Sequence, residues 1–404
     1  MPTKGKDGFY HSKVVPAPGV KPVYFRARTL REFNEKRQSI IEQYRTGRNP
    51  KDMTFVALAE EWFTVVKSPR VKPSTAINLR LFLKNHILPA FPPQQLARAV
   101  RYADLQRCVD LLEGYSATPI TQAIGFLKNI CRYGISNGVM DADYSTALRR
   151  PRAAKAAPRS ALTADQAAVL RRSFVPDPMH LALMFQYYCG LRCGESLAVQ
   201  WGDINFSAAR LHVCRQYNKT TRTVTDLKGD RFDRADSAAR FVDIPEELLA
   251  LLKPLRSLPS LYVCTSSAEP YTYGAFKYHF VKMMLVLGFA HHNDNYAAAQ
   301  KKARASGGPS DPWYNPNNYD TDFTPHNLRH NYATALYRAG IDPAMAMVLL
   351  GHSSYNTTLN VYTDIKNMMA QDVHLDDHLL AAMKKVAFKL QTRRDGTSNN
   401  AKNP

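Results

Sequence analysis

Three short segments in the C-terminal half of the chain contain the residue types that an attack on a phosphodiester requires. Arg192 lies in YYCGLRCGESLAVQWGDI. His326 and Arg329 lie in TPHNLRHNYAT at positions i and i+3, so that they share one face of a helix. His352 and Tyr362 follow in LLGHSSYNTTLNVYTD, ten residues apart. These five side chains are the candidate chemistry of the sequence.

Attack on a phosphodiester needs positive charge at the non-bridging oxygens, a nucleophile, and an acid for the leaving oxygen. Arginines supply charged planar forks, histidines donate hydrogen bonds or move protons, and a tyrosine can be a covalent nucleophile. No carboxylate cluster with metal-ligand spacing accompanies the three segments, and Asn327 stands where a zinc-binding HExxH motif needs glutamate. These residues predict phosphoryl transfer without a metal or another cofactor. Because the chain has 21 tyrosines, and Tyr355 comes only three residues after His352, residue types alone do not choose the nucleophile.

Helices and short strands must position these residues. Gly190 should end an apolar helix and let Arg192 project from the junction, with Glu195 close enough in sequence to support it. The polar segment 217–239 is expected to connect two strands. Apolar spacing predicts helices at 179–188, 273–287, 328–339, 343–350, 357–366 and 374–389, and strands at 210–215 and 240–244.

The charge of the chain indicates a polyanionic partner. Lysine and arginine number 54 against 34 acidic residues, which gives a net charge of +20 and a pI near 9.7. Such a protein is attracted to nucleic acid first and to anionic membranes second. The 45% hydrophobic content excludes wholesale disorder, and no apolar run is long enough to predict a membrane helix or a secretory leader. Six cysteines without a CxxC motif fit a reduced compartment.

The composition also divides the chain into segments. Residues 1–50 carry a net charge of +7 and predict short strands before a helix at 29–44, with Thr29 and Glu32 as a capping box, although an unstructured basic arm is the alternative. The fold class expected is multidomain and mainly α, with small β elements. We expect a basic module at 1–50, a helical domain at 51–150, an exposed basic linker at 151–159, a mixed α/β domain at 160–390 with a long loop at 290–322, and a disordered polar tail at 391–404.

Taken together, GLRCGESLAVQWGDI, TPHNLRHNYATAL and LLGHSSYNTTLNVYTD resemble the tyrosine recombinase (phage integrase) family. Each segment is weak alone, but they occur in the order of the family, and Arg192 and Tyr362 are separated by 170 residues, which is its scale. The resemblance covers about residues 52–385, and the spacing from His352 to Tyr362 is similar to that in phage and conjugative-transposon integrases. It implies an arm-binding module at 1–50, a helical core-binding domain of the SAM-like type at 51–150, and the catalytic domain at 160–390.

The resemblance implies a role for each of the five residues. Arg192 and Arg329 would bind the scissile phosphate, and Tyr362 would attack it, which gives a 3′-phosphotyrosyl link and a free 5′-hydroxyl. His326 and His352 would assist through hydrogen bonds or proton transfer.

The family also uses a lysine of a β-hairpin as the general acid toward the 5′ oxygen. Lys228 in TVTDLKGDRFDRADSAARFVDIP is the first choice. The stretch between Lys228 and the strand at 240–244 is longer than in the family, so Lys219 remains the alternative.

The function implied is site-specific DNA recombination of the integrase or excisionase type, for a mobile element. The alternatives are a type IB topoisomerase-like enzyme and a DNA-binding protein that has lost strand exchange. The implied partners are double-stranded DNA attachment sites, a homotetramer on DNA, and a small directionality factor or host DNA-bending protein, in the cytoplasm of a prokaryotic cell. The apolar stripe of the helix at 374–389 should cover either its own domain or a neighbouring protomer.

Overall fold

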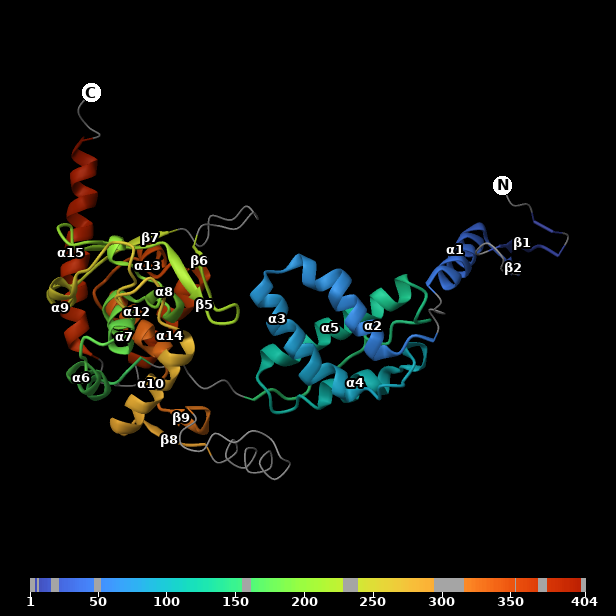
Figure 1. Cartoon of the computed structure of the whole chain (residues 1–404), viewed down its shortest axis with the longest axis horizontal. Helices are drawn as coiled ribbons and strands as arrows, with labels where there is room; N and C mark the ends of the chain where they lie inside the picture. The colour runs from blue at the N-terminus through green and yellow to red at the C-terminus, as the bar shows by residue number, and fades with distance from the viewer. Residues whose placement is uncertain are drawn as a thin grey trace. The chain divides into compact units, whose positions relative to one another are not determined.

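The structure is a computed structural model that separates the chain into two compact units, Met1–Ala157 and Pro158–Pro404 (Figure 1). The boundary between them falls within residues 151–159, for which the sequence predicts a linker. No helix in the described part of the chain is long and apolar enough to cross a membrane. The residues described are 4–5, 7–15, 22–46, 52–154, 161–227, 239–293, 316–352, 354–369 and 376–400.

The first unit begins with a β-hairpin and a helix, as the alternation in residues 8–27 predicts. Strands β1 (Tyr10–Val14) and β2 (Val23–Ala27) pair antiparallel, and α1 (Leu30–Thr46) follows them. The ring of Phe33 in α1 lies 5.1 Å from that of Phe25, so the helix packs on the hairpin. The predicted cap is present, because the Glu32 amide donates to Thr29 Oγ1 at 3.1 Å. The described part of residues 1–50 is therefore the predicted module of strands and a helix, and not the alternative of an unstructured arm.

The rest of the first unit is helical. Trp62 and Phe126 pack edge to face at 5.2 Å within its core. The α-helices are α2 (Phe55–Trp62), α3 (Pro73–Phe82), α4 (Tyr102–Asp110) and α5 (Ala117–Ser136). Wider π turns extend α2 and α3 over Phe63–Lys67 and Leu83–Ile87, and 3-10 turns cover Ser68–Arg70, Leu88–Ala90 and Ala97–Ala99. The helical domain that the sequence predicts is confirmed, and π and 3-10 turns lengthen its α-helices.

The second unit is built around α7 (Pro178–Cys189), whose residues from Met179 onward are all buried. Helix α12 (Pro325–Arg338) packs against it. Gly190 ends α7 with φ +64°, and a Cβ there would lie 2.2 Å from the ring of Tyr332. The remaining helices are α6 (Ala164–Arg172), α8 (Cys193–Ser196), α9 (Glu246–Leu252), α10 (Tyr273–Val286), α13 (Pro343–Leu350) and α14 (Tyr355–Met369), with 3-10 turns at Trp201–Asp203, Lys253–Leu255 and Pro316–Asn318.

Small antiparallel sheets complete the second unit. One has the order β3-β4-β7, with β3 (Ile204–Asn205), β4 (Arg210–Val213) and β7 (Arg240–Asp243). The pair β8 (Ala290–His292) and β9 (Tyr319–Thr321) joins the two ends of the expected long loop, and residues 294–315 between them lie outside the described part.

The hairpin of β5 (Arg215–Asn218) and β6 (Thr223–Asp226) is a difference from the sequence prediction, which placed a polar connection over 217–239. Its strands have four residues each and are mostly polar, so they lack the apolar spacing on which the prediction relied. Arg222 closes the turn with φ +57°.

Helix α15 (Asp377–Asn400) answers one question that the sequence left open and corrects one expectation. It packs against α12 of its own unit, and Leu379, Met383 and Val386 are buried in the core of that unit. In this structure the apolar stripe therefore covers its own domain rather than a neighbouring protomer. The helix also continues to Asn400, through residues predicted to be a disordered tail.

Candidate active site

Arg192 is positioned by the break between α7 and α8, as the sequence predicts. The left-handed Gly190 turns the chain, and Arg192 becomes the residue that precedes the first turn of α8. The Glu195 carboxylate accepts from the Arg192 amide at 2.9 Å and from its Nη1 at 2.8 Å. The predicted support of Arg192 by Glu195 is therefore present. The Arg192 side chain keeps 39% of its surface exposed and can still contact a ligand.

Arg329 is presented from the second turn of α12 and is almost completely buried. Its Nη1 donates to the carbonyl of Gly190 at 2.6 Å, and its Nη2 donates to the carbonyl of Leu350. Burial, and then the neighbouring Arg192, lower the pKa of Arg329 to about 9, so the guanidinium remains charged at neutral pH. The structure thus brings the two predicted arginines together.

His352 joins this group at the end of α13. Gly351 ends that helix with φ +61°, and the Nδ1 of His352 shares a 2.8 Å hydrogen bond with Thr358 Oγ1. Burial first, and then the charges of Arg329, Arg192 and a buried third arginine, lower the pKa of His352 to about 3. The imidazole is therefore neutral at physiological pH, and its ring nitrogens can donate or accept hydrogen bonds.

His326 lies beside the same group, in the first turn of α12. Pro325 begins the helix and Asn327 caps it by accepting from the Thr324 amide at 2.9 Å. The ring of His326 lies edge-on to that of His330 with 4.8 Å between the centroids. Positive charge at His326 also contributes to the low pKa of His352, which places the two histidines near one another.

Arg240 is the third arginine, and sequence analysis did not single it out. It is 5% exposed, and its Nη1 and Nη2 donate to the two oxygens of Glu195 at 3.1 and 2.7 Å. Burial alone would raise the pKa of Glu195, but Arg240 and then Arg192 hold it at about 2. The available signal was period-2 alternation in β7, which places Arg240 on the same face as the buried Val242.

Tyr362 is not with the arginines in this structure. It lies in α14, is 6% exposed, and its hydroxyl donates to the carbonyl of Ile341 at 3.2 Å. Its ring packs edge-on against Tyr337, 5.1 Å away, and burial raises the pKa of its hydroxyl. Ile341 follows the C-terminal end of α12, and at 1.5 Å per residue that end is on the order of 13 Å from Arg329. The competing Tyr355, at the start of α14, is 46% exposed.

The two candidate lysines belong to the β5–β6 hairpin and the chain after it. Lys219 lies in the hairpin turn, with its Nζ 5.2 Å from the centre of the Tyr273 ring. The charge of Lys219 acts to lower the pKa of Cys193, although burial raises it more. Because Cys193 follows Arg192 in the chain, the hairpin turn lies near Arg192. Lys228 lies outside the described residues, just after the buried Leu227. The choice between these lysines stays a prediction.

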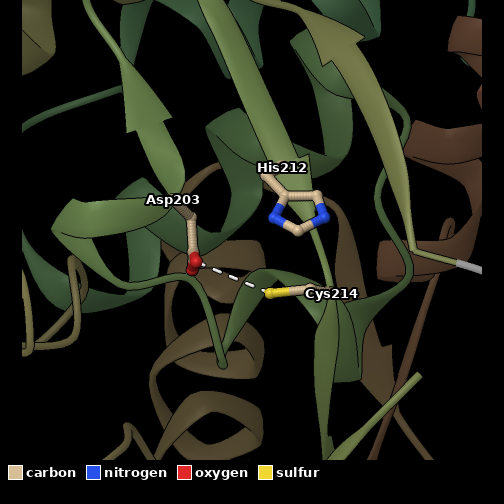
Figure 2. Close-up of side chains that lie close together, drawn as sticks. All are labelled: Asp203, His212 and Cys214. Atoms are coloured by element: carbon tan, nitrogen blue, oxygen red, sulfur yellow. Dashed lines mark hydrogen bonds between the residues drawn. The ribbon is translucent and has the colours of Figure 1, made fainter. Parts of the chain in front are cut away.

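Among the described residues, one cluster has the donor types that could hold a metal ion, namely Asp203, His212 and Cys214 (Figure 2). The donor atoms lie within 4.8 Å of one another. The Asp203 carboxylate already accepts from Cys214 Sγ at 3.5 Å and from Arg215 Nη1 at 3.0 Å. These contacts join the start of the β5–β6 hairpin to the turn before β3, so the cluster has a structural explanation within the protein.

Comparisons with known proteins find matches in both units of the chain. The phage integrase family model matches residues 291–368, and the model of the N-terminal SAM-like domain of phage integrases matches residues 54–99. The tyrosine recombinase XerC-like protein of Caldanaerobacter subterraneus subsp. tengcongensis is 24% identical over 362 residues, which cover 84% of this chain and 87% of that protein. The tyrosine recombinase XerD of Pseudomonas aeruginosa is 27% identical over 282 residues, 66% of this chain and 78% of that protein.

Solved structures share the fold. A fragment of the Tn1549 transposon integrase, in complex with a circular intermediate DNA, aligns with a TM-score of 0.51 and 17% identity over 79% of this chain and 99% of that one. A lambda integrase dimer bound to a COC′ core site aligns with a TM-score of 0.51 and 18% identity, over 90% of this chain and 94% of that one. The two family models therefore match segments in both units of the chain, and the relatives that align with most of its length are tyrosine recombinases. The chain is similar to the phage integrase family of tyrosine recombinases in sequence and in fold.

Proposed function

We propose that the chain is the integrase of a mobile element, which exchanges DNA strands at specific sites through a covalent link to Tyr362. One observation carries the residue assignment. Arg192, Arg329 and a neutral His352 converge at the C-terminal end of α13 although they come from distant parts of the chain. Two fixed cations beside a neutral, hydrogen-bonding imidazole suit the binding of a scissile phosphodiester and the charge that develops on it.

In the proposed reaction the two arginine forks bind the non-bridging oxygens of the scissile phosphate and stabilise the charge that develops on them. The phenol oxygen of Tyr362 forms the new bond to phosphorus, and the bond to the 5′ oxygen breaks. His326 takes the phenol proton, His352 assists through hydrogen bonds, and a lysine protonates the leaving 5′ oxygen. Lys228 is our first choice for this lysine and Lys219 the second. The arginines and the lysine supply the positive charge, so we expect no metal requirement.

Tyr362 must leave its contact with Ile341 before it can attack. The hydroxyl bond at 3.2 Å and the burial of the ring hold it against the end of α12. A movement of α14, or of its N-terminal turn, is therefore part of the proposed reaction. We propose that binding to a DNA site drives this movement.

The proposed partners follow from the charge and from the relatives. A net charge of +20 suits double-stranded DNA, and the solved integrases that share this fold are bound to DNA. Strand exchange between two duplexes needs four active sites, so we propose a homotetramer on DNA, which acts in the cytoplasm of a prokaryotic host. We also propose that a small directionality factor or a host DNA-bending protein takes part in the reaction.

The experiment is covalent trapping on a nicked suicide substrate made from the DNA that flanks the gene, because integrases of mobile elements often act on sites beside their own gene. The wild-type chain should form a DNA adduct, and the peptide that carries the DNA should contain Tyr362. Tyr362→Phe should bind the same DNA and form no adduct. Tyr355→Phe, the matched control seven residues away, should form it normally. An adduct with Tyr362→Phe would refute the assignment, and exchange between two intact sites separates a recombinase from a topoisomerase.

A further inference from the structure

Three guanidinium groups meet at the last turn of α13. Arg240 Nε donates to the carbonyl of Leu349 at 2.9 Å, Arg329 Nη2 to that of Leu350, and Arg192 Nη2 to that of Gly351 at 2.6 Å. The last carbonyls of a helix have no partner within the helix and carry partial negative charge. The arginines therefore fix the turn from which His352 begins.

Arg240 differs from the other two because every nitrogen of its fork is already used inside the protein. Its Nη atoms bind both oxygens of Glu195, its Nε binds Leu349, and it is 5% exposed. Arg192 shares the same carboxylate but keeps 39% of its side chain exposed. Arg240 is thus placed to hold other residues rather than to contact a phosphate.

Gly351 provides the space that Arg240 needs. A Cβ on Gly351 would lie 2.7 Å from Arg240 Nη1, and its φ of +61° is a conformation that glycine adopts without strain. The guanidinium packs directly against the backbone that precedes His352. One arginine therefore contacts both the carboxylate behind Arg192 and the turn that carries the histidine.

The negative charge of Glu195 explains why its contact with Arg240 matters for catalysis. A buried carboxylate paired with Arg192 alone would draw that guanidinium inward and offset its charge. Because Arg240 takes both carboxylate oxygens, the group of Arg192, Arg240, Arg329 and Glu195 retains two net positive charges. That excess favours the doubly charged transition state of phosphoryl transfer over the singly charged phosphodiester.

We infer that Arg240 is a positioning residue for the recombination chemistry, which acts through Glu195 on Arg192 and through the end of α13 on His352. The inference rests on the proposed function, since it assigns Arg240 to the same active site. It predicts that loss of Arg240 slows the covalent step far more than it weakens DNA binding.

The test measures adduct formation in a single turnover at saturating suicide substrate, together with the Kd for the same DNA and the thermal unfolding of each variant. Arg240→Gln should lower the rate constant about 100-fold, the effect of misplacing or removing one preorganised group, and should change the Kd less than about threefold. Arg240→Lys, which keeps the charge but not the fork, should be intermediate. Arg210→Gln is the matched control, because Arg210 lies on the neighbouring strand and pairs with the buried Asp243 at 3.6 Å. It should change the rate constant less than about twofold.

A double-mutant cycle separates positioning from a merely structural role. If Arg240 acts through Arg192, the rate penalties of Arg192→Lys and Arg240→Gln should be strongly non-additive, whereas independent effects would multiply. If Arg240→Gln does not fold, Arg240→Lys takes its place in the cycle. Rate constants for both Arg240 variants within threefold of the wild type, or multiplying penalties, would overturn the inference while the proposed function stands. Absence of any adduct with the wild-type chain would overturn both.

Discussion

The neutral His352 makes the stability of the second unit depend on pH in a calculable way. In the unfolded chain a histidine has a pKa near 6.5, whereas burial and three arginines lower the pKa of folded His352 to about 3. Below pH 6.5 the unfolded state therefore binds a proton that the folded state does not. The contribution to stability is constant above that pH and is lost progressively as the pH falls toward 3.

Two pH values inside this window give the magnitude. Between pH 7.5 and 5.0, a shift from 6.5 to about 3 costs at most about 2 kcal/mol of unfolding free energy. His352 is only partly buried, so solvent screening reduces the expected loss to about 1 kcal/mol. His352→Gln retains a hydrogen-bonding group for Thr358 but cannot be protonated, and it should lack this part of the pH dependence.

Urea unfolding of the wild type and of His352→Gln at both pH values measures the difference, because contributions from other titrating groups cancel. His279→Gln replaces an exposed histidine of α10, and should lose as much stability as the wild type. Equal losses in the wild type and His352→Gln would refute the reasoning that the arginine cluster keeps His352 neutral.

Three further predictions test other parts of the molecule. Covalent cleavage should persist in excess EDTA, because arginines and a lysine supply the positive charge; complete loss that magnesium restores would contradict the metal-free mechanism. Deleting residues 1–50 removes a net charge of +7 and none of the proposed catalytic residues, so cleavage of a short core site should survive while recombination of full-length sites falls. The salt dependence of binding to long DNA should weaken by about one slope unit per lost phosphate contact, and an unchanged slope would show that the module does not contact DNA. Truncation before Asp376 removes the buried Leu379 and Met383 and the carboxylate that binds Arg171 at 2.8 Å, so it should cost several kcal/mol and lower the Tm of the second unit; an unchanged melting curve would contradict the observed packing of α15.

Local patterns in the sequence were sufficient wherever local physics decides the structure. The spacing of apolar residues predicted α7, α10 and α13, and Gly190 was correctly predicted to end α7 and expose Arg192. The three motif segments also predicted that Arg192, Arg329 and His352 lie together, as they do in the structure. Helix periodicity and the φ of a glycine depend on a few neighbouring residues, so they can be inferred without the fold.

Contacts between distant segments could not be predicted in the same way. Arg240 binds Glu195, 45 residues before it, and Leu349, 109 residues after it, and neither contact leaves a local pattern. The position of Tyr362 depends on how α14 packs against the end of α12. The sequence of α14 alone does not determine that packing. The same limit applies to α15, because an apolar stripe shows that a face will be covered but not what covers it.

Under the proposed function, the withdrawn position of Tyr362 makes DNA cleavage a conditional event. Its hydrogen bond to Ile341 contributes about 1 kcal/mol, and the buried ring adds to this. If the total preference is 2–3 kcal/mol, the conformation able to cut is on the order of 1% of the free protein. Accidental nicking during transient encounters with ordinary DNA would fall by the same factor of about 100. Only binding to a correct site would supply the free energy that releases Tyr362 from its contact with Ile341. The protein would then distinguish a true site from the rest of a genome at the cutting step as well as at the binding step.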